Sequence, residues 1–163
     1  SLVNTGSVAN NWGNLALNAN GASLAVFDLS SSDVAHNLSL EGLAANTTVL
    51  INVHGQNVNF GAHGYDNFAS GRVLFNLPEA TQVTFSGGVY ASFLAPLASF
   101  NASGGVISGQ VIVANWSGAT QLNDVAFQGN IAAVPEPETY AMMLAGLAAI
   151  SVAAKRRRKN QTV

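Results

Sequence analysis

Short runs of alternating apolar and polar residues, separated by Gly and Asn, fill most of residues 1–138. The runs Asn57–Phe60 (NVNF) and Thr81–Thr84 (TQVT) are examples. Such alternation predicts strands with one face in a core and the other in solvent. Strong helix formers are rare here, although Ser30–Asp33 offers N-cap residues for one helical turn within Asp28–Glu41. The pattern predicts an all-β body, and the two runs predict a flat polar face suited to polysaccharide or ice.

The strand-like runs recur along the chain at nearly fixed intervals. Phe75–Pro78 matches Phe93–Pro96 and then Val111–Ala114, at an interval of 18 each time. Val49–Val53 resembles Val73–Leu77 at an interval of 24, and the extra length fits a loop within residues 56–71. Units this short cannot form a core alone, but stacked units bury a continuous one.

We therefore predict a right-handed β-helix or solenoid-like body, in which one turn of about 18 residues supplies three short strands. Asn residues at repeated positions are expected to point inward and to form ladders between turns. The alternative is an antiparallel β-sandwich, which also has short strands and frequent turns.

A different kind of segment follows the body. Residues 139–154 are uncharged and rich in Ala, Leu and Met, which favour helix, and apolar residues would surround the helix on all sides. The helix would be about 24 Å long at ~1.5 Å per residue, which is short for a bilayer core of ~30 Å. Five consecutive cations, typical of a cytoplasmic stop-transfer anchor, follow at once: Lys155, Arg156, Arg157, Arg158 and Lys159. We expect a single transmembrane helix rather than a buried core helix.

Charge divides the chain in the same way. Residues 1–138 contain one basic residue, Arg72, and all eight acidic residues, a net charge of −7, whereas residues 139–163 carry +5. Such a body lacks the cations that neutralise phosphates, so no nucleic-acid partner is expected. Cysteine is absent, which excludes disulfides, thiolate metal sites and cysteine nucleophiles.

The C-terminal features stand in a specific order: Pro135, Glu136 and Pro137, then the apolar run, then the basic cluster. Residues 134–159 resemble the PEP-CTERM sorting signal of Gram-negative bacteria. The resemblance implies Sec-dependent export and cleavage near the proline motif by an exosortase, an integral-membrane cysteine protease or transpeptidase. It further implies a precursor held in the inner membrane with its body outside the cytoplasm, and a mature form at the cell surface or in the extracellular matrix.

Such proteins also carry an N-terminal signal peptide, and none is visible in Ser1–Asn20. The sequence is therefore expected to lack its N-terminal part.

The body carries a second resemblance within residues 71–129. Residues 1–133 resemble the C-terminal half of a choice-of-anchor A domain, an adhesive module of surface proteins with various C-terminal anchors. The matching segments are Val73–Pro78, Ala80-Thr81, Phe93–Pro96, Ala98, Ile107–Ile112 and Phe127–Gly129. No catalytic residues come with this resemblance.

Candidate reactive groups are few. His54, His63 and Asp66 are the best metal-like set, but their spacing matches no standard motif, so polar loop residues are the favoured interpretation and no metal or cofactor is predicted. His36 has no partner in sequence. A carboxylate pair for glycoside hydrolysis could come from Asp28, Asp33, Glu41, Glu79 and Asp124, but solvated surface groups are favoured.

Aromatic residues are a further candidate set. Trp12, Tyr65, Tyr90 and Trp116 could stack on sugar rings if they are exposed, although core positions are more usual for aromatics.

These features together predict an exported, non-catalytic surface protein with an adhesive or structural role in the envelope or exopolysaccharide matrix. The exosortase, the export machinery, the membrane and exopolysaccharide are its expected partners. A glycan- or ice-binding module is the alternative, and a polysaccharide-active enzyme is the third hypothesis.

Overall fold

The computed structural model describes residues 4–61, 63–69, 71–131, 142–143, 145–147 and 150. The chain divides into two compact units, Ser1–Ile131 and Ala132–Val163. The described part of the first unit consists mostly of strands and turns, which confirms the predicted all-β class. One turn of 3-10 helix, η1 (Asp33–Ala35), lies where the sequence predicted a helical turn.

The strands of the described body fall into two sheets. The smaller sheet has the order β1-β2-β4-β7, and the larger has the order β3-β5-β8-β10-β9-β6 with β11 and β12 added along β10. The strands are β1 (Ser7–Asn11), β2 (Asn14–Asn18), β3 (Leu24–Ser30), β4 (Asn37–Glu41), β5 (Thr48–His54), β6 (Asn57–Phe60), β7 (Tyr65–Asp66), β8 (Val73–Asn76), β9 (Gln82–Val89), β10 (Ser92–Ser108), β11 (Val111–Gly118) and β12 (Gln121–Asn123).

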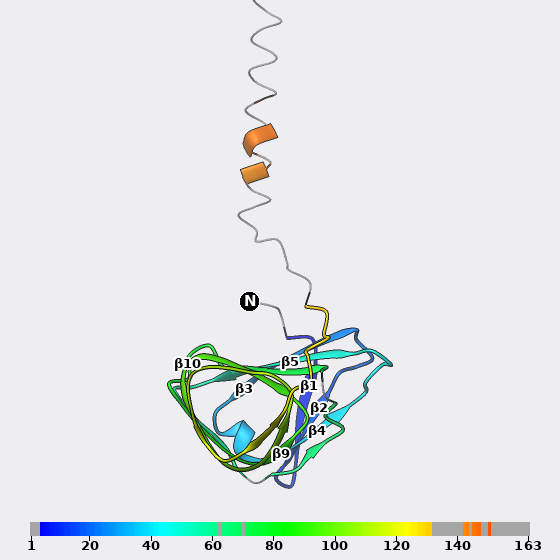
Figure 1. The fold of residues 1–163 in the computed structure, drawn as a ribbon. Helices are drawn as coiled ribbons and strands as arrows, with labels where there is room; N and C mark the ends of the chain where they lie inside the picture. The colour runs from blue at the N-terminus through cyan, green and yellow to red at the C-terminus, as the bar shows by residue number, and fades with distance from the viewer. Residues whose placement is uncertain are drawn as a thin grey trace, which may run out of the picture. The chain divides into compact units, whose positions relative to one another are not determined.

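The larger sheet is parallel throughout and curls on itself, as Figure 1 shows. Val49 lies beside Val73, an interval of 24, and Phe93 lies between Phe75 and Val111, an interval of 18 on each side. These are the intervals of the sequence repeat. Because the strands pair in parallel, the antiparallel sandwich is wrong for this sheet.

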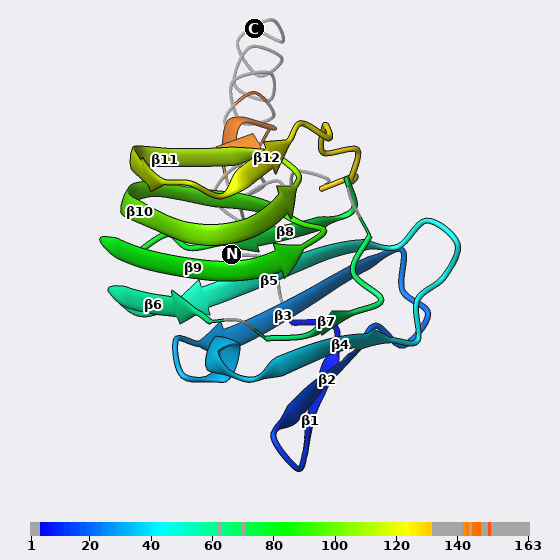
Figure 2. The same cartoon turned by 60° about the horizontal axis from the view of Figure 1, so that its bottom comes forward.

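The long strand β10 runs along two successive sides of the curled sheet. Its first part pairs with β8 and its later part with β9, and the register against β11 shifts between Ala95 and Ser99. On the side formed by the later part of β10, Figure 2 shows β6, β9, β10 and β11 stacked one above another. Residues 56–71, within which the sequence predicts a loop, contain the strand-like run 57–60 as β6, which pairs with β9, and the short strand β7, which pairs with β4.

Alternation fills the inside of the curl with apolar side chains. Along one inward column, Phe27, Ile51, Phe75 and Phe93 are each 1% exposed or less. Phe75 and Phe93 stack with ring centroids 5.1 Å apart, and Phe60 meets both rings edge-on. Burying each such side chain contributes ~1.5–3 kcal/mol, so the repeated Phe positions fix which face points inward.

The smaller sheet begins with the β1–β2 hairpin. This is the one antiparallel pair among the described strands, and its two-residue turn is Trp12-Gly13. Both turn residues have positive φ, 52° and 87°, as a type I′ turn requires. Trp12 is fully exposed at the tip.

After β12 the chain turns back along the curl instead of adding another turn. The Phe127 N–H donates to Gln110 Oε1, the Gln128 N–H to the Gly71 carbonyl and the Asn130 N–H to Thr48 Oγ1. We call residues 124–131 the strap, because these bonds attach the segment to residues just before β11, just before β8 and at the start of β5.

The second unit contains the predicted sorting signal. Of residues 139–154, the described ones (142–143, 145–147 and 150) are helical. No helix within the described residues is long and apolar enough to span a membrane. Pro135, Glu136 and Pro137, and the basic residues 155–159, lie outside the described part of the chain.

Candidate functional site: a polar face on the curled sheet

Two columns of small uncharged polar side chains cover the outside of β6, β9, β10 and β11. Strand register places the runs 57–60 and 81–84 side by side. Their polar residues face outward, as the alternation predicted. One column is Asn57, Gln82, Ser99 and Asn115, and the other is Asn59, Thr84, Asn101 and Ser117. We call these side chains the polar face. All of them are exposed except Ser99, which is half-buried.

The polar face is held rigid from beneath. The residues between the two columns point inward, and Val58, Val83 and Phe100 are at most 2% exposed. Neighbouring parallel strands lie about 4.8 Å apart, so the outer side chains repeat at that spacing across the face. Hydrogen bonds connect some of them: Thr84 Oγ1 donates to Asn59 Oδ1 at 2.8 Å, and Asn115 Nδ2 to Ser99 Oγ at 3.4 Å.

Sequence reasoning found only half of this surface. Ser99, Asn101, Asn115 and Ser117 were missed because the interval changes at the corner of β10. Gln82 pairs with Ser99 at an interval of 17, and Ser99 pairs with Asn115 at an interval of 16, so a repeat of 18 does not align them. The alternation in Ser99–Ala102, polar then apolar, was the available signal.

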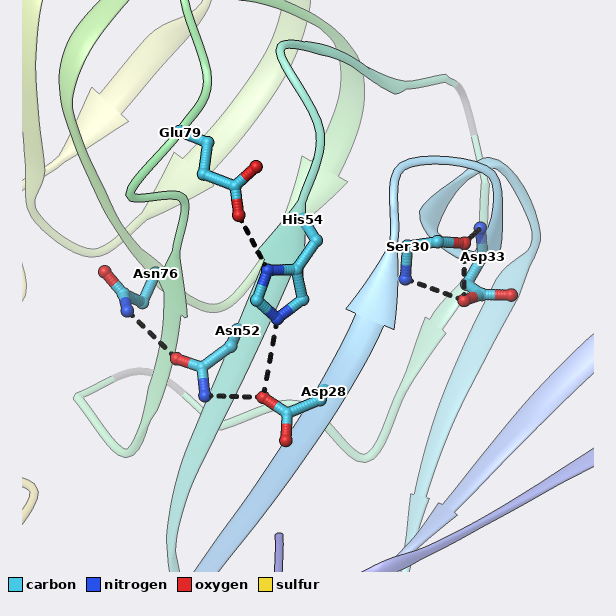
Figure 3. A network of polar contacts seen from close by, with 7 residues as sticks. All are labelled: Asp28, Ser30, Asp33, Asn52, His54, Asn76 and Glu79. Atoms are coloured by element: carbon cyan, nitrogen blue, oxygen red, sulfur yellow. Dashed lines mark hydrogen bonds and ion pairs between the residues drawn. The ribbon is translucent and has the colours of Figure 1, made fainter. Parts of the chain in front are cut away.

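A separate polar network lies on the outside of β3, β5 and β8 (Figure 3). Asn76 Nδ2 donates to Asn52 Oδ1, and Asn52 Nδ2 donates to Asp28 Oδ1, each at 2.9 Å. This is a ladder between turns of the kind expected, but it points outward. The expected inward direction was wrong, because the alternate residues Phe27, Ile51 and Phe75 occupy the interior.

His54 belongs to the same network rather than to a metal site. Its Nδ1 donates to Glu79 Oε1 at 2.9 Å, and its Nε2 lies 3.7 Å from Asp28 Oδ1. The hydrogen bond with Glu79 raises the pKa of His54 above 6.5. Within the described residues, no three His, Asp or Glu side chains gather as metal ligands do. Asp66 pairs in register with Ser39 in the smaller sheet, away from β5, which carries His54.

The remaining carboxylates are distributed over different elements. Asp33 Oδ2 accepts bonds from the Ser30 N–H and hydroxyl at 2.7 Å, which closes the turn before η1. Glu41 ends β4, and Asp124 begins the strap. Glu79 and Asp28 both lie beside His54, so the imidazole stands between the two carboxylates.

The four aromatic candidates have different surroundings. Trp12 and Tyr90 are exposed, whereas Trp116 stacks on Phe100 with ring centroids 5.2 Å apart. Tyr65 packs against Phe68 and Phe75, and burial raises its pKa. Its buried hydroxyl has no hydrogen-bond partner among the described residues. Tyr65 is therefore partly buried against the core and is not exposed for stacking on a sugar ring.

His36 also has a local role. Its Nδ1 lies 3.1 Å from the Ser32 carbonyl oxygen, where it closes the turn around η1.

Comparison with known proteins gives two family matches. Residues 133–158 match the PEP-CTERM protein-sorting motif, which implies an exported exosortase substrate. No match was found among curated proteins or among solved structures. Residues 1–124, most of the chain, match the model described as "Putative Ice-binding-like adhesive domain". The chain therefore belongs to this family of ice-binding-like adhesive domains and carries a PEP-CTERM sorting motif at its C-terminal end.

Proposed function

We propose that this chain is a non-catalytic surface adhesin whose polar face binds hydroxyl-rich polymers of the cell envelope or exopolysaccharide matrix. The observation that carries the proposal is the uncharged, outward array of Asn, Gln, Ser and Thr side chains on a rigid sheet. The adhesive family and the sorting motif support a role at the surface.

The chemistry of the polar face fits neutral sugars. Amide and hydroxyl side chains each donate and accept hydrogen bonds, as sugar hydroxyls do. Each bond contributes about 1 kcal/mol net, so useful affinity needs several at once. A repeating polymer can make the same contact at successive positions of a repeating face, which matches the regular spacing of the two columns.

We further propose an architecture for the body and a membrane topology for the precursor. The curled sheet is a short right-handed β-helix of the choice-of-anchor A type, supported by parallel strand pairing at intervals of 24 and 18. Residues 139–154 form a transmembrane helix that holds the exported precursor in the inner membrane, with Lys155–Lys159 on the cytoplasmic side. The exosortase then releases the body to the surface.

The proposal is tested by binding to immobilised exopolysaccharide and to a neutral glucan. The double variant Asn101→Ala, Ser117→Ala removes two contacts of the polar face. The matched control, Ser7→Ala with Asn11→Ala, removes the same groups from the exposed strand β1. We expect the polar-face variant to bind about 30-fold more weakly, since two hydrogen bonds of about 1 kcal/mol each are lost, and the control to bind like the wild type. Equal binding by all three proteins would contradict the proposal.

Ice is the second candidate ligand, because the polar columns of the face are regular and the matched family is ice-binding-like. Inhibition of ice recrystallisation by the wild type, reduced in the Asn101→Ala, Ser117→Ala variant, would favour ice. Inhibition that is unchanged in this variant would exclude the polar face as an ice-binding surface.

A further inference from the structure

The two ends of the curled sheet differ in how the core is covered. At the end formed by β3 and β6, η1 packs against both strands, and its Val34 is fully buried. The Thr5 and Gly6 N–H groups also donate to the Val26 carbonyl on β3. The beginning of the curl is therefore covered by the chain itself.

The opposite end, residues 111–123, is not covered by any described element of the body. We call it the open end. Its inward residues lie one level above fully buried ones, yet they are exposed: Trp116 is 36% exposed above Phe100 at 1%, and Leu122 is 47% exposed above Ile107 at 0%. Val111 and Val113 are half-buried above Phe93 and Ala95. The open end is thus an apolar layer on which no further turn of the described sheet is stacked. Repeat and solenoid proteins usually end in capping repeats with a polar outer face.

The backbone of the open end is also unpaired on one side. Among the described strands, β11 pairs only with β10. The Phe93 N–H donates to the Gln110 carbonyl, so alternate residues of β11 bond to β10, and the N–H and C=O groups of Val111 and Val113 point away from it. These are the groups that an added strand would bind.

Two usual protections of an exposed sheet edge, charged side chains and Pro, are absent from β11. Edge strands commonly carry Lys, other charges or Pro, which block pairing with a second chain. Residues 80–123 contain no charged residue, and no Pro occurs between Pro96 and Pro135. The strap follows β12 but bonds to the β5, β8 and β11 levels rather than extending along the open edge of β11.

We propose that two copies of this chain join through their open ends, with β11 of one copy pairing antiparallel with β11 of the other across a twofold axis. The distribution of charge favours association of two copies at the open end rather than at another surface of the body. Residues 1–131 carry six acidic residues and one Arg, so most self-contacts bring negative charges together, whereas the open end presents an uncharged surface to its twin. The dimer covers the exposed core and leaves both polar faces available to a ligand.

Residues 1–131 are suited to the test, because they form a compact unit and contain all the buried core residues found in the described part of the chain. Analytical ultracentrifugation of this fragment is expected to show a dimer. Ile112→Lys places two ammonium groups in the uncharged interface, and we expect it to weaken association by at least about tenfold. Val8→Lys is the control: it adds the same charge at an exposed apolar residue of β1, and the dimer should persist.

A second variant acts through the backbone. Val113→Pro removes an N–H that points away from β10, a position where an edge strand tolerates Pro. It should also give a monomer, with the circular dichroism spectrum of the folded wild type. A monomeric wild-type fragment, or a dimer that survives both Ile112→Lys and Val113→Pro in folded form, would overturn the proposal. Loss of the dimer in Val8→Lys would place the interface elsewhere and would also overturn it. Polysaccharide binding is measured separately, so failure of either proposal leaves the other standing.

Discussion

Gly104 and Gly105 are neighbours in β10, but only one of them requires glycine. Gly105 has a φ of +83°, and a Cβ there would overlap the backbone carbonyl of Gly87 on β9. At Gly104 nothing lies within 4 Å of an added Cβ. We expect Gly105→Ala to lower the free energy of unfolding by at least about 2 kcal/mol, because backbone strain and overlap add. Gly104→Ala should change it by no more than about 1 kcal/mol. Urea unfolding compares them, and equal effects would contradict this packing.

Also at the residue scale, the His54–Glu79 bond makes stability depend on pH. The pKa of His54 in the folded state is raised above its ordinary value of 6.5. The bond therefore stabilises the fold below pH 6.5, and this contribution is lost as the pH rises through the raised pKa. The effect should be small, because both side chains are 53% exposed and solvent screens the pair. Glu79→Gln should lower the pKa of His54 in an NMR titration. It should also destabilise the protein more at about pH 6 than at about pH 9; the reverse order would be evidence against the bond.

At the scale of elements, the strap decides where the folded body ends. The family match stops at residue 124, but the compact unit extends to Ile131. A chain ended at Asp124 loses the hydrogen bonds that the strap makes to Gln110, Gly71 and Thr48. We expect it to unfold with a free energy about 1–3 kcal/mol lower than a chain ended at Ile131. Thermal unfolding of the two proteins measures the difference, and identical transitions would mean that the strap adds nothing to stability.

For the whole molecule, the separation of charge is the main property. The body is acidic, and residues 139–163 carry five cations and no acidic residue. If an exosortase cleaves near Pro135–Glu138, cleavage removes the five C-terminal cations and leaves Arg72 as the one basic residue within residues 1–138. Mass spectrometry of the surface-exposed protein should therefore find a C-terminus close to this motif. Mature protein that retains Arg156–Arg158 would contradict processing at the predicted place.

The repeat was readable from sequence because each inward position needs an apolar residue at the same register. The pairs Val49 with Val73 and Phe75 with Phe93 are neighbours in the sheet for this reason. Strand pairs beyond the irregularities of the sheet could not be read from the sequence in this way. The register shifts between Ala95 and Ser99 and again between Ala102 and Gly104, and beyond such a bulge the interval no longer predicts which residues meet.

The sequence by itself determined the all-β class, the repeat intervals and the sorting motif, because these depend on residue order and alternation. Only the tertiary structure decided which polar residues share a surface. It joined the runs 57–60 and 81–84 to Ser99, Asn101, Asn115 and Ser117, and it directed the Asp28–Asn52–Asn76 ladder outward. It also showed that the curl is covered at one end and open at the other. These facts depend on contacts between residues far apart in the chain, such as Thr48 with Asn130, which local patterns do not specify.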